Sequence, residues 1–273
     1  MTNFKEETSY PVWEIISSII NNLKVFYPPK SEHEQDFRQY INDLIEAQLD
    51  RLGVEQKKNE PSNDTKLRCA ILSLAIYAKN SEVIEKLASF YQLDYEKIDS
   101  DTRFAILRSK FLNSKEEIFA DLLEKYQNTV DPDIKDDILA VLTTTKESKN
   151  IDEMVKILHN SKIVRPQDHM HLYVYLRRNF YTKGKAFDWL IENWQYVCQM
   201  NGGKSIEDYP RLTASTIYNK AEQAKFVEFF DKLAENPALK RAIAVAKPEI
   251  QSKIDWISLN SQDMANFFKK SSK

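Results

Sequence analysis

Apolar residues recur along most of this chain with the period of an α-helix. A residue on one face of a helix is followed by others three, four, seven and eight positions later. Two runs have this spacing: Leu67, Ala70, Ile71, Leu74, Ala75 and Ala78 in one, and Phe187, Leu190, Ile191, Trp194, Val197 and Cys198 in the other. Shorter runs over 119–126 and 151–158 repeat it. The pattern predicts amphipathic helices, each with one buried face.

Polar and proline-containing breaks divide these runs into about a dozen helices of roughly 10 to 20 residues, joined by short loops. Between residues 62 and 200 the helices come in pairs, and a new pair begins about every 35 to 50 residues. Such spacing is typical of α-solenoids, in which helical hairpins bury one face on the next. We therefore predict an all-α fold. It would be an α-superhelix of antiparallel helix pairs, like armadillo or HEAT repeats, in a single domain over residues 1–273.

Several predicted helices begin at residues that suit a helix N-terminus. In a capping box, a small polar side chain accepts a hydrogen bond from a free amide, and a Glu three positions later reaches back. This spacing occurs at Ser31 and Glu34, at Ser114 and Glu117, and at Asn150 and Glu153. Asp131 also precedes Pro132, a residue that suits the first helical position. We expect a helix to start at each of these sites.

The composition excludes several classes of protein. Only four glycines occur in 273 residues, and neither G-x-G-x-x-G nor G-x-x-x-x-G-K-[ST] is present. Nucleotide-binding α/β domains need clustered glycines at the phosphate loop, and hairpin-rich β folds need them at turns. Lys and Arg number 39 against 41 Asp and Glu, a formal net charge of −2. This balance argues against a dedicated nucleic-acid binder.

The chain also lacks the signs of a membrane or secreted protein. No apolar run approaches the roughly 18 residues of a membrane span, and the N-terminus has no signal-peptide core. The two cysteines, Cys69 and Cys198, form no C-x-x-C motif. Asn63 opens a glycosylation sequon, but nothing indicates secretion. We expect a cytoplasmic protein with neither membrane nor nucleic-acid partners.

The stretch HEQDF at residues 33–37 differs by one position from the H-E-x-x-H zinc motif. In that motif two histidines one helical turn apart bind the metal, and the glutamate acts as general base. Here Phe37 stands in place of the second histidine and continues an apolar stripe, while Glu34 belongs to a capping box. We interpret the stretch as a helix start followed by a core phenylalanine, without a metal.

The other histidines suggest no metal or catalytic site. His169 and His171 are two positions apart, so on a helix they point to different sides and cannot easily bind one ion. His159 is isolated near a predicted helix end. No G-x-S-x-G elbow is present either. We predict no catalytic, cofactor-binding or metal-binding residue in this chain.

The stretch YVYLRRNFYTKGK at residues 173–185 interleaves cations with aromatic rings. This pattern occurs in nucleic-acid binders. An amphipathic helix explains it as well, with Tyr173, Leu176 and Phe180 facing inward and Arg177 and Arg178 facing outward. Because the net charge is negative, we favour the amphipathic helix.

Eight stretches, taken in order, resemble one family. They are YPVWEIISSIINNL (10–23), LDRLGVEQKKNE (49–60), LRCAILSLAIYAKN (67–80), KIVRPQDHMHLYVYLRRN (162–179), AFDWLIENWQYV (186–197), RLTASTI (211–217), FVEFFDKL (226–233) and IQSKIDWISLNSQDMANFFK (250–269). Their order and spacing resemble the C-terminal helical domain of the aminopeptidase N-type zinc aminopeptidases, a gluzincin group. The resemblance extends from about Tyr10 to Phe268, and it depends on the stretches in combination.

This resemblance implies a role for the chain. In the family, the domain is a bowl of antiparallel helices that caps the zinc domain, encloses the substrate cavity and limits peptide length. The family's H-E-x-x-H motif, its downstream glutamate ligand and its G-x-M-E-N loop lie on an earlier domain, and this sequence contains none of them. We therefore expect a non-catalytic terminal domain that begins inside the family domain. Its partners would be the catalytic zinc domain and peptide substrates, and the zinc would belong to that catalytic domain.

Two arginines are candidate substrate-binding residues. Arg211 opens RLTASTI and matches a family position that is often basic. A guanidinium suits a carboxylate because it can donate two parallel hydrogen bonds. Arg165 is a weaker candidate, because its stretch could instead start the next helix through Asp168. For both arginines the alternative is an ordinary surface or interhelix contact.

Two other functions remain open at this point. One is a free-standing helical-repeat scaffold that binds a protein partner, since solenoid surfaces often do so. The other is an RNA-binding helical repeat that uses Arg177 and Arg178. An H-E-x-x-H motif upstream in the parent reading frame would favour the aminopeptidase, whereas a true start codon at Met1 would favour the scaffold. The aminopeptidase hypothesis also predicts apolar surface where the zinc domain would pack.

Overall fold

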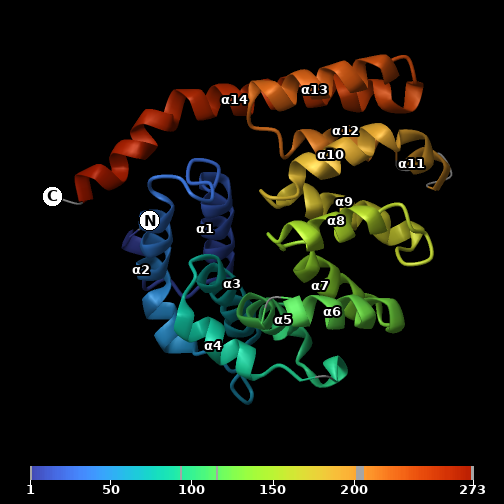
Figure 1. The fold of residues 1–273 in the computed structure, drawn as a ribbon. Helices are drawn as coiled ribbons and strands as arrows, with labels where there is room; N and C mark the ends of the chain where they lie inside the picture. The colour runs from blue at the N-terminus through green and yellow to red at the C-terminus, as the bar shows by residue number, and fades with distance from the viewer. Residues whose placement is uncertain (1, 93, 115, 201–205, 272–273) are drawn as a thin grey trace. The chain divides into compact units, whose positions relative to one another are not determined.

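The computed structural model describes residues 2–92, 94–114, 116–200 and 206–271. Within these ranges every regular element is a helix, as Figure 1 shows, and the prediction of an all-α fold is confirmed. The chain forms two compact units. Unit 1 comprises Met1–Val141 together with Ala265–Lys273, and unit 2 comprises Leu142–Met264. A superhelical arrangement within one domain stays a prediction.

Unit 1 is built from the first helices of the chain. They are η1 (Thr2–Phe4), α1 (Tyr10–Leu23), α2 (Glu34–Leu52), α3 (Ser62–Tyr77), α4 (Ser81–Ser89), η2 (Tyr95–Lys97), α5 (Ser100–Ser114), α6 (Glu116–Asn128) and α7 (Pro132–Leu142). Helices α1, α2 and α5 pack on α3, and α5 also packs on α4. Helix α1 buries Trp13, Ile16 and Ile20 on one face, whereas Ile15 and Ile19 on the other side are 62% and 42% exposed.

Unit 2 contains the remaining helices. They are α8 (Ser148–Ile157), α9 (Pro166–Arg178), α10 (Lys183–Glu192), α11 (Trp194–Met200), α12 (Asp208–Ala214), α13 (Lys220–Phe230), η3 (Asp231–Leu233) and α14 (Pro237–Ser271). Helix α9 packs on α10 and α12. Helix α14 has 35 residues with Pro248 inside it, and it continues beyond Met264 into unit 1.

The predicted helix starts have mixed outcomes. At α7 the prediction is confirmed, because Asp131 Oδ1 accepts hydrogen bonds from the amides of Asp133 (2.9 Å) and Ile134 (3.1 Å). At α8 it is wrong, because this helix begins at Ser148 and Asn150 is buried inside it. The third site depends on Glu117, whose side chain lies outside the described residues.

HEQDF does start a helix, although not through the predicted capping box. Helix α2 begins at Glu34, and Ser31 Oγ is a buried atom with no hydrogen-bond partner in the described part of the chain. The Glu34 carboxylate instead accepts hydrogen bonds from the amide of Lys30 (2.7 Å) and from Nη2 of Arg38 (2.8 Å). Burial opposes ionisation of Glu34, but these bonds hold its pKa below the usual value. Phe37 is 2% exposed, so its core position is confirmed.

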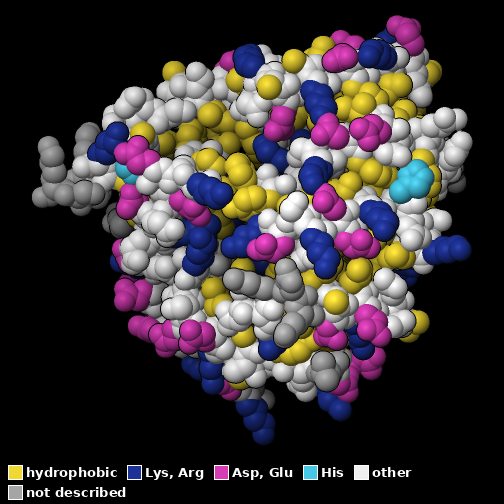
Figure 2. Space-filling model, viewed as in Figure 1, with side chains coloured by type: hydrophobic (Ala, Val, Ile, Leu, Met, Phe, Trp, Pro, Cys, Tyr) yellow, Lys and Arg dark blue, Asp and Glu magenta, His cyan; other side chains and the backbone are white. Residues whose placement is uncertain are grey.

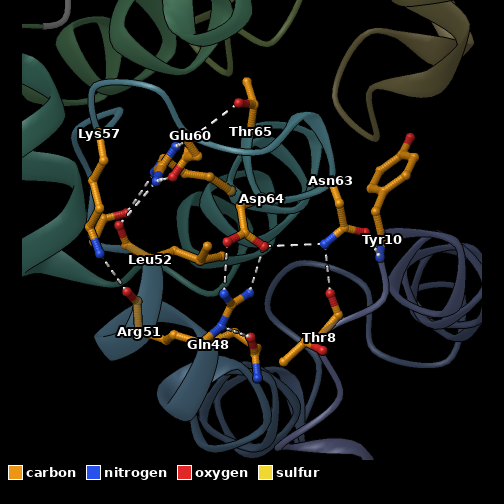
Figure 3. Close-up of polar contacts among 12 residues, drawn as sticks. Thr8, Tyr10, Gln48, Arg51, Leu52, Lys57, Glu60, Asn63, Asp64 and Thr65 are labelled. Atoms are coloured by element: carbon orange, nitrogen blue, oxygen red, sulfur yellow. Dashed lines mark hydrogen bonds and ion pairs between the residues drawn. The ribbon is translucent and has the colours of Figure 1, made fainter.

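A buried ion pair organises the connection between α2 and α3. Arg68, which is 1% exposed, pairs with Glu60 and donates a hydrogen bond to the Leu52 carbonyl at the end of α2 (3.1 Å). The hydrogen bonds from Arg68 lower the pKa of Glu60. Beside this pair, Arg51 donates to both carboxylate oxygens of Asp64 (3.0 and 3.2 Å), as Figure 3 shows. The polar stretch 53–61 is therefore fixed by charge-assisted hydrogen bonds.

Asn63 holds the segment that leads into α1 (Figure 3). Its Oδ1 accepts a hydrogen bond from the amide of Tyr10, and its Nδ2 donates one to the carbonyl of Thr8, both at 2.9 Å. Gln48 adds a bond from Nε2 to the Lys5 carbonyl (3.0 Å). The side-chain nitrogen of the Asn63 sequon is thus engaged in holding the fold.

Candidate functional site

The predicted residue Arg211 lies on the surface of unit 2. It belongs to α12, its side chain is 60% exposed, and its Nη2 is 3.1 Å from Oε1 of Glu249 on α14. An exposed pair of this kind contributes about 0–1 kcal/mol, and it leaves donor groups facing solvent. Arg211 is therefore accessible to a ligand, but it already has one carboxylate partner.

The second predicted residue, Arg165, is bound to its own helix. It occupies the position before α9, and its Nε and Nη2 contact Oδ2 and Oδ1 of Asp168 at 2.6 and 3.0 Å. This bidentate pair fixes the first turn of α9. The structure therefore assigns Arg165 a contact at the helix start, the alternative left open by the sequence.

His169 and His159 contribute to hydrogen bonding and ring packing in unit 2. His169 is fully buried, and its Nδ1 and Nε2 lie 2.9 Å from the Tyr209 hydroxyl and 3.1 Å from the Leu158 carbonyl. Because a carbonyl can only accept, Nε2 carries the proton and Nδ1 accepts from Tyr209. Burial lowers the pKa of His169 to about 4. His159 stacks on Tyr196 with ring centroids 4.1 Å apart. No group of three His, Cys, Asp or Glu that could hold a metal occurs among the described residues.

The predicted outward position of Arg177 is wrong. This residue, at the end of α9, is 1% exposed and donates to the carbonyls of Lys183 (2.5 Å) and Thr213 (3.4 Å). Its guanidinium lies 5.1 Å from the Phe187 ring centroid. Phe180, predicted to face inward, follows the end of the helix and is 49% exposed. Arg177 is therefore a buried cation held by backbone carbonyls.

Arg177 is part of a cationic group that we call the Tyr218 cluster. Its members are Arg177 of α9, Lys183 of α10, Tyr218 before α13, Glu222 of α13 and Lys253 of α14. The Lys183 ammonium is 2.8 Å from Glu222 Oε1 and 5.7 Å from the Tyr218 ring centroid. Arg177 Nη2 lies 3.6 Å from the other oxygen of Glu222. Glu222 thus faces two of the three cations, and the five residues together carry excess positive charge.

The Tyr218 cluster reaches the surface. Tyr218 is 37% exposed, and Lys253 donates to the Ser215 carbonyl (3.0 Å) while lying 6.0 Å from the Tyr218 ring centroid. Burial raises the pKa of Tyr218, and burial lowers that of Lys253. Glu249, the partner of Arg211, stands one helical turn before Lys253. The group therefore offers ammonium and phenol donors suited to an anion such as a carboxylate.

Sequence reasoning missed most of this cluster. The basic and aromatic stretch 173–185 contains Arg177 and Lys183, but Tyr218, Glu222 and Lys253 come from other segments and carry no motif.

On the face seen in Figure 2, basic and acidic side chains are interspersed. That mixture does not form the single-sign stripe that a nucleic-acid backbone requires.

Cys69 and Cys198 are both free, and burial raises the pKa of the Cys69 thiol to about 11. A thiol with so high a pKa is a poor nucleophile at neutral pH. Among the described helices none is long and apolar enough to cross a membrane.

Comparison with known proteins identifies relatives over nearly the whole chain. The family model of the ERAP1-like C-terminal domain matches residues 1–252. Aminopeptidase N of Lactobacillus helveticus is 28% identical over 262 residues, which is 94% of this chain and 31% of that protein. Glutamyl aminopeptidase of Bos taurus is 22% identical over 269 residues, 97% of this chain and 28% of that protein. The chain thus spans about a third of the length of the relatives that it matches.

Proposed function

Because this chain belongs to the ERAP1-like C-terminal domain family, we propose that it is the non-catalytic C-terminal domain of a zinc aminopeptidase. In this role it caps the active site and forms a wall of the peptide-substrate cavity. Its partners are the catalytic zinc domain of the parent chain and peptide substrates. We also propose a cytoplasmic location, which the two free cysteines support.

One observation carries this proposal: the family model covers residues 1–252 and the relatives that match are named aminopeptidases. The absence of H-E-x-x-H from the sequence is consistent with zinc chemistry on another domain. A chain of this kind contributes to the reaction through binding and enclosure of the substrate.

We propose the Tyr218 cluster as the group that attracts the free carboxylate of a peptide. Lys183 and Lys253 supply ammonium donors beside the partly exposed Tyr218. Arg211 is linked to the cluster through α14, because it pairs with Glu249, which precedes Lys253 by one helical turn. An excess of cations favours a carboxylate through Coulomb attraction, most strongly where water is excluded.

The parent enzyme offers the direct test. Lys183→Gln and Lys253→Gln should each raise KM about five- to tenfold for peptides with a free C-terminus, the effect of roughly 1–1.4 kcal/mol of lost attraction. The same variants should leave KM unchanged for C-terminally amidated peptides and for aminoacyl-anilides. Lys232→Gln is the matched control, since that lysine is 71% exposed and pairs with Glu228 within its own segment. An equal rise for free and amidated peptides would refute this role.

The isolated chain tests the absence of catalysis. We expect less than about 0.1 zinc per chain by mass spectrometry of metals after dialysis, since no described residues form a metal site. We also expect no hydrolysis of aminoacyl-anilides. Stoichiometric zinc together with hydrolysis would overturn this part of the proposal.

A further inference from the structure

Lys24 is a half-buried lysine at the C-terminal end of α1 in unit 1, and it pairs with no carboxylate among the described residues. Its Nζ donates a hydrogen bond to Oδ1 of Asn21 (2.6 Å). That amide oxygen is neutral, so it compensates the charge of an ammonium less than a carboxylate does. Burial without an opposite charge favours the neutral form of an amine.

A second cation shares an aromatic ring with Lys24. Lys24 Nζ lies 3.8 Å from the ring centroid of Tyr77 on α3, and Cζ of Arg38 on α2 lies 4.6 Å from the same centroid. Arg38 donates from Nε (2.9 Å) and Nη2 (2.8 Å) to Oε1 of Glu34, an oxygen that also lies 3.6 Å from Lys79 Nζ. Nη1 of Arg38 has no hydrogen-bond partner in the described part of the chain. The acid beside the two cations is therefore engaged by Arg38 and Lys79, and Lys24 has no share in it.

Burial and Arg38 together determine the charge of Lys24. The face of the Tyr77 ring and the C-terminal end of α1 both attract a cation. Burial opposes them, with a smaller contribution from the charge of Arg38, and the pKa of Lys24 is lowered from 10.5 to about 8. At pH 7.4 about a fifth of Lys24 is therefore a neutral amine, against about 0.1% for a lysine with the ordinary pKa. A desolvated lysine beside another cation is an activated nucleophile.

A small pocket between α1 and α3 adjoins Lys24. Its volume is about 210 Å³, and its lining includes Lys24 itself, the polar Asn21, Ser17 and Ser73, and the apolar Leu74. Oγ of Ser17 is buried and has no hydrogen-bond partner in the part of the chain that the structure describes. Pockets for drug-sized ligands begin at about 300 Å³. This one therefore suits a smaller group that carries a polar atom.

We propose that Lys24 is an acylation site, at which a small acyl phosphate transfers its acyl group to Nζ. The pocket receives the acyl group, and Nη1 of Arg38 donates to the phosphate oxygens. The product carries an uncharged amide at Lys24 and leaves Arg38 as the cation at the Tyr77 ring. The modification concerns unit 1, and it does not depend on the aminopeptidase role proposed above.

The transfer is a single substitution at the acyl carbon. The lone pair of the neutral Nζ attacks the carbonyl carbon and forms the C–N bond of an amide. The bond from that carbon to the bridging oxygen breaks, and the oxygen leaves with the electron pair as part of the phosphate. The proton lost by the nitrogen passes to the phosphate, so the products are an amide and hydrogen phosphate. No oxidant, reductant or metal takes part.

Acetylation of the full chain by acetyl phosphate at pH 7.4 tests the proposal, with the initial rate at each lysine measured by digestion and mass spectrometry. Lys24 should react at least about tenfold faster than Lys97, because far more of it is neutral. Lys97 is the control for access, since its side chain is 71% exposed and its hydrogen bond with Asp94 raises its pKa. Equal rates, or a faster reaction at Lys97, would overturn the proposal.

The pH dependence of the two rates gives a second test. The rate at Lys24 should level off above about pH 8–9, where its amine is already neutral, whereas the rate at Lys97 should continue to rise beyond about pH 10. Rates that rise in parallel over this range would show that Lys24 reacts as an ordinary lysine, and they would refute the proposal.

Two variants on α2 test the part played by Arg38. Arg38→Gln should slow acetylation of Lys24 at least about threefold, because it removes both the neighbouring charge and the phosphate donor. Arg51→Gln changes an arginine of the same helix that binds Asp64, and it should leave the rate at Lys24 unchanged. Circular dichroism verifies that both variants remain folded. A folded Arg38→Gln that reacts at the parent rate would contradict the proposed site.

Inorganic phosphate gives the last test, because it occupies the phosphate position without an acyl group to transfer. An excess of it should slow acetylation of Lys24 by acetyl phosphate and leave the rate at Lys97 unchanged. Equal rates at Lys24 with and without phosphate would show that acetyl phosphate is not bound there before it reacts, and this result would overturn the site.

Discussion

Two fully buried arginines in this protein have fixed partners. Arg68 is held by Glu60 and by backbone carbonyls, and Arg177 by the carbonyls of Lys183 and Thr213. A charge removed from water must be compensated in this way. Helical periodicity cannot predict such residues, because it counts arginine as polar and places Arg177 outside. The compensating groups come from other helices, so the sequence around the arginine does not reveal them.

His169 makes the free energy of unfolding sensitive to acid. Its pKa is about 4 in the folded protein, against an ordinary value of 6.5, since burial disfavours the charged ring. Between these two values the unfolded chain binds a proton that the folded chain does not. The free energy of unfolding should therefore fall as pH is lowered from about 6.5 to 4, by up to about 3 kcal/mol.

Urea denaturation at a series of pH values measures this effect. His169→Gln should unfold more easily at pH 7, by about 1–2 kcal/mol, because its hydrogen bonds are changed. Its unfolding free energy should also vary less between pH 6.5 and 4 than that of the parent. Equal pH dependence in parent and variant would show that another group titrates.

At the scale of the helix, the sequence pattern predicts that a helix forms better than it predicts where the helix begins and ends. The stripe that includes Phe37 is buried because a 3.6-residue period depends on many positions together. A helix start depends on one or two side chains, and alternatives compete for it. Asp131 caps α7, but Glu34 bonds to Lys30 instead of completing a capping box with Ser31. Backbone geometry decides between such alternatives, for example the φ of +70° at Lys30.

Loss of the Asp131 cap should weaken unit 1. Asp131→Ala leaves the amides of Asp133 and Ile134 without their acceptor and should reduce the free energy of unfolding by about 1 kcal/mol. Glu124→Ala changes an exposed acid on the preceding helix and should stay within about 0.5 kcal/mol of the parent. Chemical denaturation of the two variants gives the comparison, and equal stability would contradict a capping role.

The free energy of unfolding should be far more sensitive to a change in the connection between α2 and α3. Glu60→Gln leaves the Arg68 guanidinium buried without a carboxylate and should lower the free energy of unfolding by about 3–5 kcal/mol. Glu55→Gln breaks an exposed pair with Lys86, in which both side chains are more than half exposed, and should change stability by less than about 1 kcal/mol. Thermal unfolding followed by circular dichroism distinguishes the two. A small effect of Glu60→Gln would mean that Arg68 relaxes toward solvent.

At the scale of the whole chain, fold class and family could be predicted from the sequence, but the Tyr218 cluster could not, and the substrate-binding roles of Arg211 and Arg165 stay predictions. Helical spacing and the ordered stretches that resemble the family, from Tyr10 onward, can be recognised in a single sequence. The Tyr218 cluster depends on α9, α10, α13 and α14 meeting in unit 2, which is a property of tertiary packing. Of the two arginines predicted to bind substrate, Arg165 is bound by Asp168 and Arg211 shares Glu249.

The exposed face of α1 should cause the isolated chain to self-associate. Ile15 and Ile19 are 62% and 42% exposed and lie one helical turn apart, so they form an apolar patch of the kind that packs on another surface. In sedimentation velocity the parent should show a concentration-dependent increase in mass, and Ile15→Ser with Ile19→Ser should reduce it. Val130→Ser, at an isolated site that is 90% exposed, is the control. A parent that stays monomeric at high concentration would contradict this prediction.

The return of α14 into unit 1 has a consequence for protein synthesis. Phe268 packs against Tyr27 and Tyr40, and Tyr27 stacks on Phe37. These three residues of unit 1 leave the ribosome early, but Phe268 follows Phe37 by roughly 230 residues. At about 5–20 residues per second this interval is on the order of ten to fifty seconds. Unit 1 must wait through the synthesis of all of unit 2 with an aromatic surface uncovered. A nascent chain at this stage is a natural client for a chaperone that binds apolar segments.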